Sequence, residues 1–256
     1  MRKWKLVIAT LAVVACVGAT ASVYAWRTRG THGSPDVPPP DGRAAAKLPT
    51  SPQEALVECI QAMSRGDDAR FFAVVETDHG LQRDYLRTLL EFIREATRFQ
   101  DEFIRVYGRD AWVAFQDLRQ KPDDGDAHLS ILPWLENKLA WAPTAPIQQE
   151  GSEVYCVVAG EDAAPCRWIF MQSGGGWRLD GRSLCPAQNE IEKSTATLRS
   201  CAEDVRRFAK VIGYPGLRPE DIDVELGRAM VQSIHGIKLP PKRFDIEKLM
   251  PVEKGK

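Results

Sequence analysis

The fold class follows from the stretch IQQEGSEVYCVVAGEDAAPCRWIFMQSGGGWRLD, residues 147–180. Short runs rich in β-branched and aromatic residues alternate there with turn residues at Glu150-Gly151, 160–165 and 174–176. Because each connection is short enough for a hairpin, the stretch predicts an antiparallel meander. Strand alternation places Trp168 and Phe170 on one face, and we expect that face to pack against helices.

Helical periodicity flanks this meander on both sides, which predicts an α+β fold. The first helix has a marked start, because Ser51 can cap it, Pro52 suits its first position and Glu54 completes a capping box. Gly66 is expected to end it. Further helices are expected over 67–75, 81–107, 111–118, 129–139, 191–212 and 219–234.

The long helix expected over 81–107 has an apolar stripe and a charged face. Opposite charges on that face recur at i,i+4 spacing, which stabilises a helix by about 0.2–0.5 kcal/mol per pair. We therefore expect the charged face to lie in solvent. The pairs are Arg87–Glu91, Arg98–Glu102 and Asp101–Arg105.

Two segments resemble exported, membrane-anchored members of the NTF2-like superfamily. SPQEAL (51–56) continuing to AMSRGD (62–67) is similar to their proline-capped first helix, and GGWRL (175–179) looks like their closing strand. The resemblance covers residues 51–181. It implies a cone, in which helices pack inside a strongly curved antiparallel sheet around a cavity. Relatives use this cavity as an active site, a binding pocket or only a core, and dimerisation through the sheet is common among them, so a homodimer is a further expectation.

The N-terminal segment predicts export. The uncharged run from Leu6 to Trp26 is about 21 residues long, enough at about 1.5 Å rise per residue to span a bilayer core of about 30 Å. Basic residues flank it on both sides. Three outcomes stay open: a retained transmembrane anchor, a signal peptide cleaved after Ala21 or Ala25, and lipidation of Cys16. Each predicts a membrane-anchored or secreted protein, with the bulk of the chain on the extracytoplasmic, periplasmic side.

Composition divides the rest of the chain. After the signal peptide or anchor at 1–26, residues 27–50 are rich in proline and glycine and predict a disordered linker. Residues 51–185 are expected to form the NTF2-like α+β domain, and 186–237 a C-terminal helical extension. Residues 238–256, rich in proline and lysine, are expected to be a loosely attached tail.

Charge and cysteine content narrow the partners. A formal net charge of −1 leaves no field to attract a polyanion, so nucleic-acid binding is not expected. The histidines lack the spacing of a metal site, and neither a metal nor another cofactor is expected. Cys156 and Cys166 fall on the two arms of one predicted hairpin, so they could form a disulfide or remain buried thiols.

No set of residues predicts a catalytic centre. Under the resemblance, Asp84, Tyr85 or Tyr155 could supply an acidic base and a donor. We favour a non-catalytic module that binds a protein or a small apolar ligand. The alternative is a cofactor-free lyase or isomerase that acts on a small apolar substrate in the cone. The residues expected to line the cavity, or else to fill it as core, are Tyr85, Tyr155, Trp168, Phe170 and Trp177.

Overall fold

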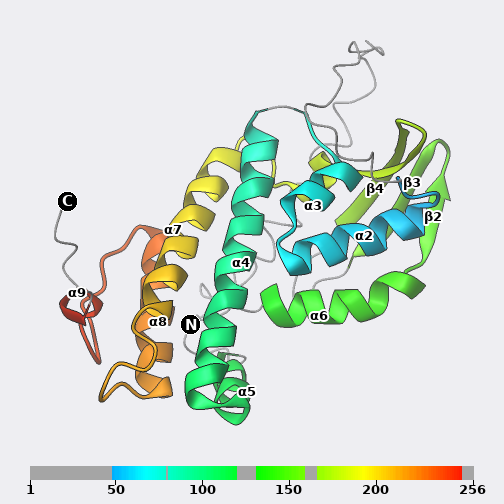
Figure 1. Cartoon of the computed structure of the whole chain (residues 1–256). Coiled ribbons are helices and arrows are strands. Elements are labelled where there is room, and N and C mark those ends of the chain that lie inside the picture. The colour runs from blue at the N-terminus through cyan, green and yellow to red at the C-terminus, as the bar shows by residue number, and fades with distance from the viewer. Residues whose placement is uncertain (1–47, 79, 120–130, 159–165, 250–256) are drawn as a thin grey trace, which may run out of the picture.

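Figure 1 shows the structure of the chain, a computed structural model. It describes residues 48–78, 80–119, 131–158 and 166–249. The expected anchor at 1–26, with Cys16, and most of the expected linker lie outside these residues. No helix in the described ranges is both long enough and apolar enough to cross a bilayer.

The predicted meander is formed. Strands β2 (Ile147–Glu150), β3 (Glu153–Val158), β4 (Cys166–Ser173) and β5 (Gly176–Asp180) pair antiparallel in chain order. A short strand β1 (Val75–Glu76) pairs with β5 in parallel, which makes the sheet mixed, in the order β1-β5-β4-β3-β2. The prediction of a helix over 67–75 missed β1, because two residues are too few to show a strand pattern. The sheet is open, with β1 and β2 as its edges.

Helices α2 (Pro52–Arg65), α3 (Asp68–Val74) and α6 (Ile131–Trp141) lie on one side of the sheet (Figure 1). The start of α2 is close to the prediction. As predicted, Ser51 Oγ accepts the backbone N–H of Glu54 at 3.1 Å. The Glu54 carboxylate does not return to Ser51 as in a capping box but accepts the backbone N–H and the hydroxyl of Thr50, each at 2.7 Å.

The predicted long helix is α4 (Leu81–Tyr107), and α5 (Arg109–Arg119) packs back against its end. Aromatic rings fill the corner between them, with centroids 4.8–6.3 Å apart. Such ring pairs contribute about 0.5–1.5 kcal/mol each beyond the area they bury. The rings are Phe99, Phe103, Trp112 and Phe115.

The remaining helices form a second layer around α4. A short 3-10 turn η6 (Gly181–Leu184) leads from β5 toward α7 (Ile191–Ala209), which runs along α4, and α8 (Pro219–His235) packs on α7 (Figure 1). The buried apolar residues of the sheet, of the helices that cover it and of α4, α7 and α8 form one continuous core. The expected extension at 186–237 therefore shares its core with the sheet-bearing part.

The charged side of α4 takes part in this helix contact, which corrects the expectation of a fully solvated face. Arg206 of α7 donates to Glu91 at 2.6 Å and to Glu95 at 3.1 Å. Arg199 of α7 donates to Asp84 at 3.3 Å. Glu91 thus pairs with Arg206 of α7 and not with Arg87, its predicted partner on the same helix.

Candidate functional site

Three of the five aromatic residues predicted to line a cavity lie in the packed core, and a fourth, Trp177, packs against it. Trp168 and Phe170, on the sheet face toward the helices, are 3% and 4% exposed, and Tyr85 of α4 is 1% exposed. The ring of Trp168 lies 6.2 Å from that of Trp134 on α6, and its indole N–H has no acceptor among the described residues. Trp177 shares this face by strand register and is half-buried. Side chains therefore fill the helix-facing side of the sheet at these positions.

Tyr155 lies on the opposite face, because its register position alternates with those of Trp168 and Phe170. The guanidinium of Arg167 lies 4.3 Å from the centroid of the Tyr155 ring. The same guanidinium pairs with Glu150 at 3.0 Å. Tyr155 therefore lies on the other face of the sheet from Trp168, Phe170 and Trp177.

Asp84, the acid considered beside the tyrosines, has a structural partner instead. Its side chain is 52% exposed and pairs with Arg199 of α7. An exposed carboxylate in an ion pair is not the desolvated acid that a base in a cavity requires. Asp84, Tyr85 and Tyr155 do not form an acid/base set.

Of the two alternatives for Cys156 and Cys166, the structure shows buried thiols and not a disulfide. Cys156 stands opposite Trp168, and Cys166 opposite Val158, so the two cysteines are diagonal neighbours. Diagonal neighbours lie about 7–8 Å apart, whereas a disulfide needs a Cα separation of about 4.4–6.8 Å. Both thiols are free and buried, and Cys166 Sγ donates to the Val158 carbonyl at 3.5 Å. Burial raises the pKa of Cys156 to about 12.

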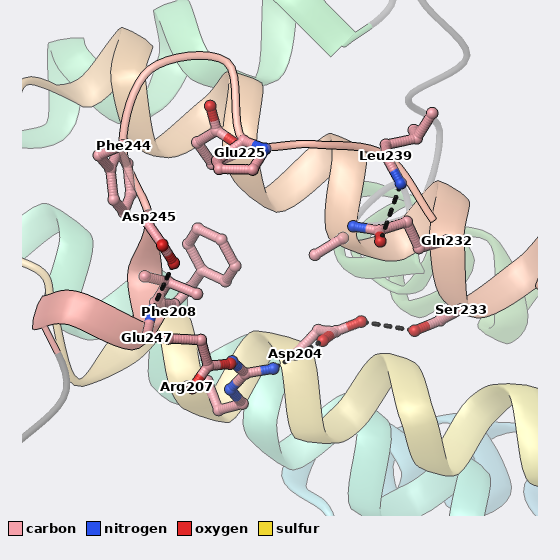
Figure 2. A pocket seen from close by; sticks show the side chains of 13 residues that line it. Asp204, Arg207, Phe208, Glu225, Gln232, Ser233, Leu239, Phe244, Asp245 and Glu247 are labelled. Carbon is pink, nitrogen blue, oxygen red and sulfur yellow. Dashed lines mark hydrogen bonds and ion pairs between the residues drawn. The ribbon is translucent and has the colours of Figure 1, made fainter. Parts of the chain in front are cut away.

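A pocket of about 270 Å³ lies elsewhere, between α7, α8 and the chain that follows α8 (Figure 2). Gly236, with φ 65°, ends α8 in the left-handed conformation. Residues 237–249, which we call the C-terminal strap, then run back past α8 and end in α9 (Ile246–Leu249). The pocket has one wall from each of α7, α8 and the strap.

Side chains of α8 fasten the strap, which corrects the expectation of a tail loosely attached from residue 238. The Glu225 carboxylate accepts the backbone N–H of Lys242 at 2.6 Å and also that of Arg243. The side-chain oxygen of Gln232 accepts the backbone N–H of Leu239 at 3.1 Å. Glu225 therefore holds two successive backbone N–H groups of the strap, and Arg228 of α8 adds a hydrogen bond to the Pro240 carbonyl at 2.6 Å.

The α7 wall holds a buried carboxyl group, that of Asp204. Its Oδ2 accepts the Ser233 hydroxyl at 2.6 Å, and Ser233 Oγ lies 2.7 Å from Ser200 Oγ. Arg207 lies 3.7 Å from Asp204 and also pairs with Glu247 of the strap. Burial raises the pKa of Asp204, while the Ser233 bond and the Arg207 charge offset part of that rise.

Two aromatic rings contribute to the pocket lining. Phe208 of α7 and Phe244 of the strap meet edge to face, with centroids 6.1 Å apart. Figure 2 shows these rings on one side of the pocket, with Glu225 and Asp204 above and below it. The pocket thus presents carboxylate oxygens beside aromatic surface.

No protein-family model, curated protein or solved structure matches this chain. Within the described ranges, no three His, Cys, Asp or Glu side chains gather closely enough to hold a metal ion.

The sequence prediction missed this pocket, although two residues signalled it. Asp204 falls within the apolar stripe of its helix, three residues after Cys201 and four before Phe208. Glu225 similarly adjoins the buried Leu226 in α8. Acidic residues are almost never fully buried unless they are paired, so both positions could have been singled out as candidates.

Proposed function

We propose that this chain is a non-catalytic binding module, held on the extracytoplasmic side of a membrane by its N-terminal segment. One observation carries the non-catalytic part: Trp168 and Phe170 pack as core residues where the NTF2-like resemblance implies a cavity. A catalytic cavity there would need open volume and convergent polar groups. A packed interior favours a module that makes its interactions elsewhere on the molecule.

We also propose the NTF2-like cone as the fold type. Support comes from the resembling segments, from the order of helices before a four-stranded meander, and from helices on one side of the sheet. A homodimer through the sheet belongs to the same proposal. Light scattering coupled to size-exclusion chromatography of the full chain tests the homodimer. A measured mass equal to that of one chain would refute it.

A cofactor-free lyase or isomerase is the second candidate, and one observation favours it. Asp204 is a buried acid beside a pocket, and burial raises its pKa, as is common for catalytic acids and bases. The contacts of Asp204 with Ser233 and Arg207 equally fit a network that fixes α7 on α8. The module therefore remains the preferred proposal.

Membrane fractionation tests the tether. The full chain is expected in carbonate-washed membranes and open to protease added to spheroplasts, while a variant lacking residues 1–26 stays soluble. N-terminal sequencing then separates a retained anchor from cleavage after Ala21 or Ala25. Recovery of the chain in the soluble fraction, either intact or cleaved after Ala21 or Ala25, would contradict the tether.

Ligand recovery tests the absence of catalysis. Compounds that raise the melting temperature of the full chain in detergent are incubated with it for a day and followed by NMR. A binding module returns each compound unchanged. Conversion of a bound compound that is lost in Asp204→Asn would instead establish the enzyme.

A further inference from the structure

The pocket between α7, α8 and the C-terminal strap has a lining that selects for ligand charge. We propose that it binds a small organic cation, with a primary ammonium or guanidinium group on a short apolar body. This inference rests on the proposed binding function and names its ligand class. Four observations support it: the charge balance, a buried carboxylate without a counter-ion, the aromatic lining and the volume.

The charge balance of the lining is strongly negative. Among the described residues that line the pocket, the cationic side chain is that of Arg207, and it is already shared between Asp204 and Glu247. Charges interact more strongly in a partly buried site than in water. A ligand cation is therefore attracted, and an anion is repelled. The carboxylates of the lining are Asp204, Glu225, Asp245 and Glu247.

Glu225 gives the strongest indication, because it is a buried carboxylate with no ionic partner. It is 6% exposed, and the contacts that its carboxylate makes among the described residues are hydrogen bonds and not ion pairs. Its Oε1 accepts two backbone N–H groups of the strap. Buried charges are normally paired, and a cation bound in the pocket would supply the missing counter-charge from across the cavity.

The aromatic lining suits the same ligand. Phe208 of α7 and Phe244 of the strap both line the pocket, and a cation within about 6 Å of a ring centroid is attracted to the ring face. Their hydrocarbon surface would also cover an apolar body. The pocket volume is about 270 Å³, and typical ligand pockets have volumes of about 300–1,000 Å³. This small volume limits the ligand to a small molecule or a single side chain.

Calorimetric titration of the full chain in detergent micelles tests the inference. The probes are benzylammonium, the neutral benzyl alcohol and the anionic benzoate at pH 7. Benzylammonium is expected to bind at least about tenfold more tightly than benzyl alcohol, a difference of about 1.4 kcal/mol. Benzoate is expected not to bind.

Variants localise the site. Asp204→Asn and Glu225→Gln preserve oxygen acceptors for Ser233 and for the strap, and each is expected to weaken benzylammonium binding about tenfold while leaving benzyl alcohol unchanged. Phe244→Leu is expected to weaken it severalfold. The matched control is Asp101→Asn, an exposed residue of α4 outside the pocket, which should leave both affinities unchanged.

The outcomes separate this inference from the function on which it rests. Equal binding of benzylammonium and benzyl alcohol, or no binding of either, overturns the cation site. The proposed binding module is then still tested by the membrane-fractionation and ligand-recovery experiments. If benzylammonium binds and is then converted to a product, the cation site is confirmed and the non-catalytic function is refuted. If Asp204→Asn fails to fold in a thermal melt, Glu225→Gln and Phe244→Leu decide, and unchanged ammonium affinity in both refutes the site.

Discussion

Replacing Phe170 by alanine tests whether the interior between helices and sheet is a packed core. Phe170 is 4% exposed and stands between Val154 on β3 and Leu179 on β5. Truncation to alanine would leave a void that these neighbours refill only in part. At such sites Phe→Ala costs about 3–5 kcal/mol, a large share of the about 5–15 kcal/mol that stabilises a typical domain.

Urea unfolding of the full chain, followed by tryptophan fluorescence, measures this cost. With a slope of about 2–3 kcal/mol per molar urea, the expected loss lowers the midpoint by about 1–2.5 M. The control is Tyr214→Ala, which removes a 46% exposed ring and should change stability by less than about 0.5 kcal/mol. Phe170→Leu, expected to cost less than about 1.5 kcal/mol, serves if the alanine variant does not fold.

A midpoint change for Phe170→Ala as small as that for Tyr214→Ala would refute the reasoning. Phe170 would then border space already open to water, and its truncation would remove few packed contacts. The enzyme with its site in the cone would become the better proposal, and the search for polar groups would return to the helix-facing side of the sheet.

Three further predictions follow from single contacts. Gly181→Ala places a Cβ 2.7 Å from the Glu76 carbonyl oxygen, so it should separate β1 from β5 and cost about 1–3 kcal/mol by denaturation; an unchanged midpoint would contradict the β1–β5 pairing. Arg206→Ala removes the partner of the mostly buried Glu95 and should cost about 1–3 kcal/mol, against less than about 1 kcal/mol for Arg199→Ala at an exposed pair; equal losses would contradict this ranking. Because burial raises the pKa of Cys156 from 9.0 to about 12, its thiol stays protonated at pH 8 and should resist iodoacetamide until urea unfolds the chain, as mass spectrometry would show. Its contribution to stability should fall as pH rises above about 9, since the unfolded thiol ionises there first.

Local patterns determined how much of the fold could be predicted. The meander was predictable because turn residues separate its runs, and α4 because its apolar stripe is long and ends at Gly108. Strand β1 was not, since it exists only through its pairing with β5, about a hundred residues later in the chain. The choice between a disulfide and free thiols at Cys156 and Cys166 stayed open for a related reason: shared arms of a hairpin do not fix register.

Partners of charged residues were the least predictable feature. The charged residues of α4 fit pairing along their own helix and pairing with another helix equally well. Only the packing of α7 on α4 directs Arg206 to Glu91 and Glu95. A sequence can indicate that a helix has a charged side, but the element that covers part of that side comes from the tertiary fold.

The buried acids of the pocket are the places where local and global requirements disagree, and such places are expected to be functional or strained. A glutamine at position 225 could accept the same backbone N–H groups of the strap, and an asparagine at 204 could accept the Ser233 hydroxyl. Fastening the strap and joining α7 to α8 therefore do not require negative charge, and burial of that charge is unfavourable. If the charge serves a ligand, Asp204→Asn and Glu225→Gln should keep or raise the unfolding midpoint while they weaken cation binding. A loss of stability with unchanged binding would instead mean that the carboxylates serve the helix contacts alone.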